Sequence, residues 1–276
     1  CSASSAARGH QPSWVRQEGR LRRLKDLDAL VTGAAGGIGR ALCDELQAAG
    51  CRVVATDRPG SDLSGVGDEQ IEADVTSWDD WERLAAALPD AALLVNNAGL
   101  TVHAPLLAMS PEQIAGVLDV NLKGVAFGCR AMLPALLRQD EAHIVNLSSM
   151  AALLGIPSQS TYCASKWGVR GLSASLRLEL SGTCVGVTAV LPGTVATSFL
   201  ATAQSSDHAL TQQLSGLMLR YGLKPPALAR GIRRAVERDR AEVVAGWDAH
   251  ATALVRGVVP GLVHAALGAA WRRWGR

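Results

Sequence analysis

The stretch ALVTGAAGGIGRALCDEL, residues 29–46, decides the fold. It opens on a short apolar run that is typical of a buried strand, and from Ile38 apolar residues recur at helical spacing. Glycines at positions 33, 37 and 39 separate the two parts. They let the backbone turn tightly and approach a pyrophosphate, which the free N–H groups and dipole of a helix N-terminus stabilise. The stretch therefore predicts a strand–turn–helix unit that binds a dinucleotide.

The same alternation of short apolar runs and helical periods continues to residue 245, which is typical of βαβ units around a parallel sheet. The expected strands are Ala29–Thr32, Arg52–Thr56, Gln70–Asp74, Ala92–Asn96, His143–Leu147, Gly186–Leu191 and Glu242–Ala245. The expected helices include Ile38–Ala49, which Gly50 ends, one that starts at Ser110-Pro111 with Gln113 completing a capping box, and one over about Thr161–Leu180. The sequence therefore predicts an α/β fold, a single doubly wound, Rossmann-like parallel sheet over residues 28–246 with a C-terminal helical extension.

Two segments interrupt or precede this alternation. Residues 1–27 are polar and rich in Arg, and their leucines at 21, 24 and 27 have helical spacing, so we expect a flexible leader that ends in a short helix. Residues 198–226 contain the polar, weakly periodic stretch Ala201–Pro226. An insertion after a late strand favours a mobile flap over the ligand crevice, and an ordinary surface loop is the alternative.

The C-terminal residues 247–276 form an apolar, amphipathic tail with a basic rim. Pro260 and Gly261 predict two short helices in it, because proline interrupts a helix. The apolar stripe consists of Ala253, Leu254, Val258, Leu262, Ala265 and Leu267. Three uses of the tail remain open: packing on its own domain, forming a subunit interface, or resting on a membrane surface.

Composition narrows the class of protein. Of 276 residues, 48% are hydrophobic and 19% charged, which suits one large domain with a substantial core. The net charge of +2 is too small and scattered for a nucleic-acid binder. The six cysteines form no CxxC pair and no Cys/His cluster at zinc spacing, so we expect no metal and a reducing compartment. With no signal peptide or bilayer-spanning run, a soluble cytoplasmic protein is expected.

Asp57 bears on the choice of dinucleotide. It ends the second expected strand, about 20 residues after the glycine loop, where a carboxylate binds the adenosine ribose hydroxyls. A carboxylate there repels a 2′-phosphate, which favours NAD, and the neutral Gly36 offers NADP no cation. The neighbouring Arg58 could accept that phosphate, so NADP is the alternative. Asp57 could also be only a turn residue before Pro59-Gly60.

Ser149, Tyr162 and Lys166 carry the candidate chemistry. Tyr162 and Lys166 are four residues apart on an expected helix, so their side chains leave the same face. An unperturbed tyrosine has a pKa of about 10, and a lysine ammonium one turn away is expected to lower it. Ser149 follows an expected strand and can hydrogen-bond a substrate oxygen. The three residues predict proton transfer to or from a substrate hydroxyl.

From Ala29 to Thr197 the sequence resembles the short-chain dehydrogenase/reductase family, in the branch of roughly 250 residues with a Tyr-x-x-x-Lys motif. Ser149 precedes Tyr162 by 13 residues, which matches the family's spacing and selects Ser149 over Ser148. The motifs, in the family's order, are Thr-Gly-x-x-x-Gly-x-Gly at 32–39, Asp74-Val75, Asn96-Asn97-Ala98-Gly99, Asn121 before Leu122, Ser149, Tyr162-Cys-Ala-Ser-Lys166 and Pro192-Gly193-Thr194-Val195-Ala196-Thr197.

The resemblance implies roles for these residues. Tyr162 would be the acid/base, Lys166 would also bind the nicotinamide ribose, and Ser149 would polarise the substrate oxygen. Asn121 would hold a water that links Lys166 to solvent, although an Asn near Gly124 could mark only a helix kink. The implied cofactor-binding set comprises Gly33, Gly36, Gly37, Ile38, Gly39, Asp57 and Arg58 at the phosphate and ribose, Asp74 and Val75 at the adenine, Asn97, Ala98 and Gly99 beside the ribose, and Pro192, Gly193, Val195 and Thr197 at the nicotinamide.

These observations predict an oxidoreductase that transfers a hydride between NAD and a neutral, lipophilic secondary alcohol or ketone. The substrate class rests on the side chains expected at the crevice, none of them ionisable: Met150, Leu153, Leu154, Phe199 and Leu200. An NADP-dependent carbonyl reductase is one alternative, and a non-catalytic NAD-sensing module is another, against which the complete set of Ser149, Tyr162 and Lys166 argues. The expected partners are a small-molecule substrate and, by analogy with the family, further copies in a dimer or tetramer, with no nucleic acid.

Overall fold

The computed structural model describes Leu21, residues 23–258 and six later positions: Gly261, Ala265, Gly268, Ala269, Trp271 and Arg272. Most of the expected leader and the second short helix of the tail lie outside the described residues. Within them, a seven-stranded parallel sheet forms the centre, in the order β3-β2-β1-β4-β6-β7-β9. Its strands are β1 (Asp28–Thr32), β2 (Arg52–Asp57), β3 (Glu69–Glu72), β4 (Ala91–Asn96), β6 (Ala142–Leu147), β7 (Val185–Pro192) and β9 (Glu242–Ala245).

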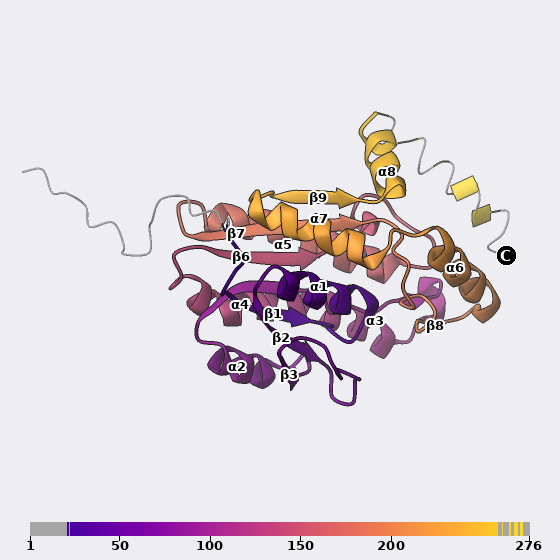
Figure 1. The fold of residues 1–276 in the computed structure, drawn as a ribbon. Coiled ribbons are helices and arrows are strands. Elements are labelled where there is room, and N and C mark those ends of the chain that lie inside the picture. The colour runs from indigo at the N-terminus through magenta and orange to yellow at the C-terminus, as the bar shows by residue number, and fades with distance from the viewer. Residues whose placement is uncertain are drawn as a thin grey trace, which may run out of the picture.

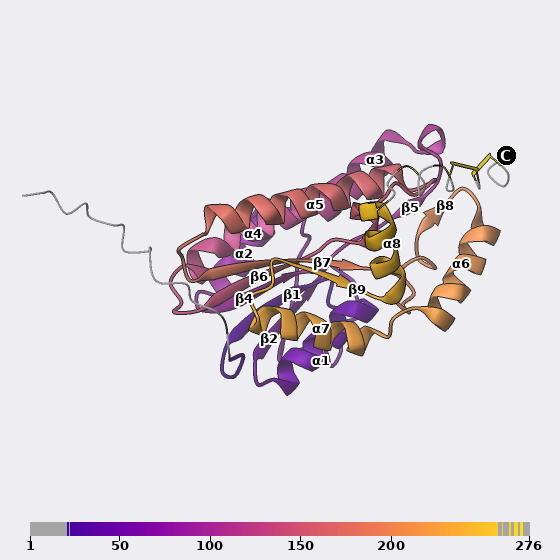
Figure 2. The same cartoon turned by 90° about the horizontal axis from the view of Figure 1, so that it is seen from above.

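Helices cover both faces of this sheet, which confirms the predicted doubly wound fold (Figures 1 and 2). One face carries α1 (Gly37–Ala48) and α7 (Pro225–Glu237), and the other carries α2 (Trp78–Ala87), α4 (Gly124–Leu136) and α5 (Ser160–Glu179). Leu42 of α1 and Ile232 of α7 belong to one apolar core, and Trp81 of α2 and Met132 of α4 belong to the other. Because both faces are covered, the central strands β4 and β6 are buried along their whole length and are mostly apolar.

The helix between β4 and β6 is continuous but irregular. It begins as α3 (Pro111–Leu118), where Ser110 and Gln113 form the predicted capping box. It then passes through a π-helical turn, η2 (Asp119–Lys123), before continuing as α4. Single π-helical turns inside α-helices occur often at functional sites, because they re-aim one side chain.

The N-terminal boundary differs from the prediction. Residues 23–27 form a turn and no helix, and Leu21 and Leu24 are buried in the core beside α1 and α7. The helical spacing of these leucines was therefore misleading, because they pack in the core from an irregular segment that contains a turn. The end of this segment belongs to the folded domain, not to a flexible leader.

The predicted flap region contains more regular structure than its polarity indicated. It holds a short strand, β8 (Gln204–Ser205), and a helix, α6 (His208–Tyr221). Strand β8 pairs in parallel with β5 (Val102–His103), outside the main sheet. Pro225 and Pro226 do not end a loop, as expected from the sequence, but begin α7, since proline is tolerated in the first turn of a helix.

The C-terminal extension begins as a helix, as predicted. This helix, α8 (Trp247–Val258), follows β9 directly and buries Ala249. Ala253 packs against an apolar cluster with Leu153, Leu191 and Val244. The first half of the extension therefore packs on its own domain, at the end of the sheet to which the strands point (Figure 1).

Candidate active site

The glycine loop joins β1 to α1 and has no room for side chains. A Cβ on Gly39 would lie 2.1 Å from the Gly33 carbonyl oxygen, and one on Gly37 would lie 2.9 Å from Cγ2 of Thr197. Gly33 has a φ of +64°, which glycine adopts without strain. No side chain caps the N-terminus of α1 at Gly36, so its first N–H groups remain available to a phosphate. Ile38 lies in the first turn of this helix.

A second loop, after β4, is fixed to the glycine loop by one threonine. The Thr32 hydroxyl accepts hydrogen bonds from the N–H groups of Asn97 and Ala98, each at 3.0 Å. The Asn97 side-chain amide donates to the carbonyls of Thr32 at 2.9 Å and Gly33 at 3.0 Å. Gly99 follows, where a Cβ would lie 3.6 Å from the Lys166 ammonium. The two loops therefore form one rigid edge between β1 and β4, where the strand order reverses and ligands bind in such folds.

Asp57 ends β2 beside this edge. Its carboxylate accepts a hydrogen bond from the N–H of Ala35 in the glycine loop at 3.0 Å. It also accepts from the Arg58 N–H at 2.8 Å and the Ser61 hydroxyl at 3.1 Å. Asp57 is thus a turn residue and a neighbour of the glycine loop at the same time, so the two interpretations of it are compatible.

Asp74 and Val75 lie one strand further out. The expected strand Gln70–Asp74 ends two residues earlier, at Glu72, so Asp74 lies in a loop. Its carboxylate accepts hydrogen bonds from the N–H and hydroxyl of Thr76. The carbonyl of Val75 accepts from the indole of Trp81 at 2.9 Å. These contacts hold the loop against α2 at the carboxyl end of β3.

Tyr162 and Lys166 share one face of α5, as predicted. The Lys166 ammonium lies 5.7 Å from the centre of the Tyr162 ring. It donates a hydrogen bond to the Leu147 carbonyl, at the end of β6, at 2.8 Å. Lys166 is buried, whereas Tyr162 is partly exposed. The pair therefore lies at the carboxyl end of the sheet, beside Gly99.

The expected effect of the lysine on the tyrosine is not what the structure shows. Burial raises the pKa of Tyr162 to about 12, and a hydrogen bond with Ser149 opposes that rise. The Lys166 ammonium is not among the groups that shift this pKa. Burial also lowers the pKa of Lys166 to about 8, because the charged form loses its hydration. The prediction of a lowered tyrosine pKa was wrong for the protein alone, since it considered helical spacing and not burial.

Ser149 is free to serve the site, whereas its neighbour is not. The Ser148 hydroxyl is buried and donates to the Lys166 carbonyl at 2.8 Å. Ser149 lies just after β6 and remains partly exposed, and its oxygen accepts from the Ala151 N–H at 3.1 Å. Met150 follows it and is also partly exposed. The geometry therefore agrees with the choice of Ser149 over Ser148.

Asn121 occupies the π-helical turn and is buried. Its side chain accepts from the Leu100 N–H and donates to the Leu100 carbonyl, both at 2.8 Å. It also donates to the hydroxyl of Ser165 at 3.1 Å, which in turn donates to the Tyr162 carbonyl at 2.7 Å. Asn121 therefore ties the loop after β4 to α5, and the helix irregularity gives it that position.

The loop after β7 completes the site. It runs from Pro192 and Gly193 to Thr197, whose methyl lies against Gly37 of the glycine loop. Val195 forms a parallel bridge with Leu223, which closes the base of the flap. Phe199, in the first residues of the flap, has its ring centre 6.1 Å from that of Tyr162. The flap therefore starts beside the proposed acid/base, and its end is held by the loop after β7.

Comparison with known proteins agrees with this geometry. The sequence pattern of the short chain dehydrogenases matches residues 28–208. The chain belongs to this family.

Relatives and solved structures place the chain among NAD(P)-dependent oxidoreductases of the short-chain dehydrogenase/reductase family. It is 32% identical to a Staphylococcus saprophyticus protein named only as an oxidoreductase, over 78% of this chain and 92% of that one. It is 35% identical to a 3-oxoacyl-[acyl-carrier-protein] reductase of Synechocystis, over 74% of this chain and 87% of that protein. The structure of a family member from Burkholderia phymatum in complex with NAD has a TM-score of 0.79 at 29% identity. The match covers 87% of this chain and 96% of that one. Another, from Burkholderia cenocepacia in complex with NADP, has a TM-score of 0.77 at 29% identity. This match covers 89% of this chain and 98% of that one.

Sequence reasoning missed one residue that holds the site of this dehydrogenase together. Asp248, in the first turn of α8, accepts a hydrogen bond from the Thr194 N–H at 2.7 Å. Gly193 and Gly246 leave room for it, since a Cβ on either would lie within 3 Å of its carboxylate oxygen. The only signal in the sequence was an acid at a helix start, which is common at N-termini. The helical extension therefore fixes the loop after β7.

Replacing Asp248 with Ala should weaken dinucleotide binding. The Thr194 N–H would lose its acceptor, a loss that costs about 1–3 kcal/mol for a buried donor and would let the loop after β7 shift. We expect the KM for the dinucleotide to rise about tenfold, with a smaller change in kcat, measured by steady-state kinetics. Asp79→Ala is the matched control, because Asp79 holds the same first-turn position in α2 and is exposed. Equal KM values for the two variants would contradict a positioning role.

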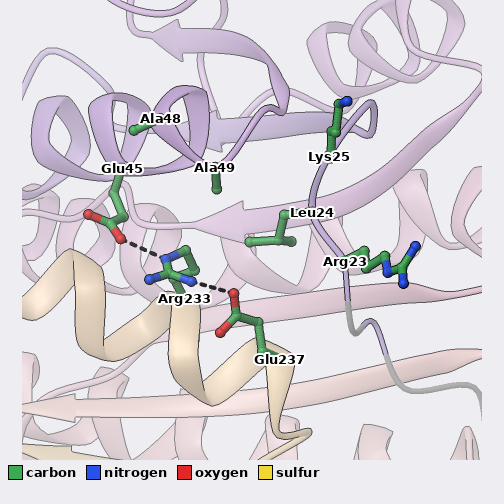
Figure 3. Close-up of a pocket in the computed structure, with 8 residues that line it drawn as sticks. All are labelled: Arg23, Leu24, Lys25, Glu45, Ala48, Ala49, Arg233 and Glu237. Atoms are coloured by element: carbon green, nitrogen blue, oxygen red, sulfur yellow. Dashed lines mark hydrogen bonds and ion pairs between the residues drawn. The ribbon is translucent and has the colours of Figure 1, made fainter.

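One surface pocket of the dehydrogenase lies away from the residues proposed for the chemistry. A surface pocket of about 520 Å³ lies where α1 and α7 end, and Arg233 in it pairs with Glu45 and Glu237 (Figure 3). Since α1 and α7 end at the amino side of the sheet, this pocket is remote from Tyr162.

Among the described residues, no helix is long and apolar enough to cross a membrane, and no cluster of His, Cys, Asp or Glu could hold a metal ion.

Proposed function

We propose that this short-chain dehydrogenase uses NAD to oxidise a neutral, lipophilic secondary alcohol, or to reduce the corresponding ketone. The observation that carries the choice of NAD is the Asp57 carboxylate at the end of β2, 3.0 Å from the Ala35 N–H of the glycine loop. A carboxylate in that place can accept hydrogen bonds from ribose hydroxyls and repels a 2′-phosphate. Arg58 remains the argument for NADP, since its backbone lies next to this carboxylate.

The glycine loop and the N-terminus of α1 fit a dinucleotide. The glycines of the loop pack directly against neighbouring backbone and place no side chain toward the ligand. The N-terminus of α1, which no side chain caps, faces the space where a pyrophosphate would lie. Gly33, Gly36, Gly37, Ile38 and Gly39 would hold the phosphates. Asp74 and Val75 would contact the adenine, Asn97, Ala98 and Gly99 the ribose, and Pro192, Gly193, Val195 and Thr197 the nicotinamide. The bound nicotinamide would supply the hydride chemistry.

The chain's own residues would handle the proton. In reduction, the Tyr162 hydroxyl donates its proton to the substrate oxygen, and Ser149 donates a hydrogen bond to the same oxygen. The Lys166 ammonium stabilises the phenolate that remains. Asn121, buried beside Leu100 and Ser165, would hold a water through which Lys166 exchanges protons with solvent. In oxidation the same groups act in reverse order.

The residues near Tyr162 support a neutral, apolar substrate. Met150 and Phe199 are both partly exposed, and Phe199 lies against the Tyr162 ring. The sequence also placed Leu153, Leu154 and Leu200 at the crevice, but all three are buried, and Leu153 packs against Leu191 and Ala253. We propose that residues 198–226 form a lid over Met150 and Tyr162, since the Val195–Leu223 bridge joins the two ends of this segment.

A second candidate is the reduction of a 3-oxoacyl thioester. It is favoured by relatives from Synechocystis and Thermotoga maritima that are named 3-oxoacyl-[acyl-carrier-protein] reductases, at 35% and 33% identity. A panel of steroid, terpene and aliphatic secondary alcohols, together with an acetoacetyl thioester, separates the candidates by NADH absorbance. We expect turnover of a secondary alcohol with NAD, and a kcat/KM that is higher with NAD than with NADP. Turnover of the thioester alone, or preference for NADP, would overturn the corresponding part of the proposal.

The rate of carbonyl reduction should fall above a pH of about 8. Lys166 has its pKa lowered to about 8, so it is charged below that pH and neutral above it. Tyr162, with its pKa raised to about 12, keeps its proton throughout this range. Reduction needs both a protonated tyrosine and a charged lysine, so only the lysine sets the limit. We expect kcat/KM for the reduced dinucleotide to be level below this pH and to decrease above it.

A Lys166→Arg variant provides the control for this pH profile, because a guanidinium stays charged over the whole range. Its rate will be lower at every pH, but the decrease above a pH of about 8 should disappear. A wild-type profile that keeps rising to pH 10, or a variant profile with the same decrease as the wild type, would contradict the role of the lysine charge.

A further inference from the structure

Helix α6 leaves large apolar side chains exposed. Thr211 and Ser215 are its buried residues, and Leu214 and Met218 beside them are partly buried. Leu217 and Tyr221, one turn apart, are 54% and 60% exposed. A surface helix normally buries its leucines and exposes its polar residues. The outer face of α6 therefore has the composition of a surface that something else covers.

Helix α8 has a similar outer face. Its first residue, Trp247, is 77% exposed, and Leu254, two turns later, is 68% exposed. Figures 1 and 2 both place α6 and α8 at the end of the molecule toward which β7 and β9 point. Exposed apolar residues from two helices thus gather at the same end, more than the isolated leucines that ordinary surfaces carry.

The charges that α6 and α8 themselves carry after their first turns are of one sign. Residues 208–236 and residues 249–276 contain no Asp or Glu, whereas Arg220, Lys224 and Arg272 in these segments are exposed. The nearest acids at the helix starts are engaged, since Asp207 accepts from the Leu210 N–H and Asp248 from the Thr194 N–H. Apolar side chains with a rim of cations are the composition that binds an anionic lipid surface.

We propose that the outer faces of α6 and α8, here called the docking face, bind the surface of a membrane that contains anionic phospholipids. The docking face consists of Leu217, Tyr221, Trp247 and Leu254, with Arg220 and Lys224. The apolar side chains enter the interfacial region and the cations pair with lipid phosphates and carboxylates. The contact is peripheral, because no helix among the described residues is long enough to span the bilayer. The proposal does not depend on which dinucleotide or substrate the enzyme uses.

A second copy of this chain fits the docking face less well. In a symmetric pair the same face meets itself, so Arg220 and Lys224 would face cations of the partner with no carboxylate between them. Like charges in contact oppose such an interface. Anionic lipid provides the opposite charge together with an apolar layer.

The test is co-sedimentation of the full chain with vesicles of phosphatidylcholine, with and without phosphatidylserine. The wild type should sediment with the anionic vesicles, and less so at high salt. A Leu217→Glu/Leu254→Glu variant should lose about tenfold or more in partition, because two apolar side chains no longer enter the lipid. Leu178→Glu is the matched control, since Leu178 is 77% exposed in the last turn of α5, at the opposite end of the sheet. It should bind like the wild type.

Thermal unfolding and sedimentation velocity without vesicles accompany each variant. A wild type that stays in solution with anionic vesicles overturns the proposal, whatever the variants do. So does a docking-face variant that binds like the wild type. If the docking-face variant instead changes the oligomeric state while vesicle binding is unaffected, the face is a contact between copies and the membrane proposal fails.

Discussion

A Tyr162→Phe variant should lose turnover by a factor of about 10²–10⁴ and bind the dinucleotide nearly as tightly as the wild type. The phenylalanine keeps the ring that lies beside Phe199 and packs against the apolar cluster of Val102 and Met109, so the local structure is expected to hold. Only the hydroxyl is lost, and with it the proton donor and acceptor of the proposed reaction. Steady-state kinetics gives the turnover, and fluorescence titration with NADH gives the affinity.

Tyr221→Phe is the matched control for this experiment, because the chain has two tyrosines and Tyr221 is exposed on α6. It should show wild-type turnover. A Tyr162→Phe variant with a rate close to wild type would remove the proposed acid/base, and equal losses in both variants would mean that the effect is not specific to the site.

An Asp57→Asn variant should shift cofactor preference from NAD toward NADP by about 100-fold in the ratio of kcat/KM values. Two effects add. A charged acceptor of a ribose hydroxyl is replaced by a neutral one, which costs NAD about 1.5–3 kcal/mol, and the repulsion of a 2′-phosphate disappears. Asn retains an oxygen that can accept from the Ala35 N–H, so the glycine loop keeps its contact. Initial rates with both dinucleotides measure the shift.

Asp90→Asn is the control for the charge change, since Asp90 is exposed just before β4, at the amino end of the sheet. It should leave the preference unchanged. If Asp57→Asn also leaves the preference unchanged, Asp57 is a turn residue only. A wild type that already prefers NADP would show that Arg58 prevails over the carboxylate.

Local patterns accounted for the sheet and for the candidate residues of the site. All seven strands of the main sheet were expected within two residues of their observed bounds, because all but the polar edge strand β3 contain an apolar run between turn residues. The spacing of Tyr162 and Lys166 placed both on one face of α5, since four residues make about one helical turn. The short strands β5 and β8 escaped notice, because two residues carry no detectable pattern.

What depends on distant packing could not be obtained in this way. Leu21 and Leu24 have helical spacing but lie in the core without forming a helix, because α1 and α7 offer them an apolar surface. The apolar residues of α6 formed no clear helical stripe, since Leu210, Leu217 and Leu219 are exposed and the buried positions are the hydroxyl residues Thr211 and Ser215. Spacing reports which side chains share a face, but not which face the rest of the chain covers.

The sequence by itself determined the fold, the family and the residues that can move a proton, because these depend on spacing of a few residues along the chain. Only the tertiary structure decided the electrostatics of the site. It buries Lys166 and encloses Tyr162, so the pKa of the lysine is lowered and that of the tyrosine raised. It also brings Asp248 to Thr194 across 54 positions. Desolvation and long-range contacts depend on the whole packed chain, and no local pattern records them.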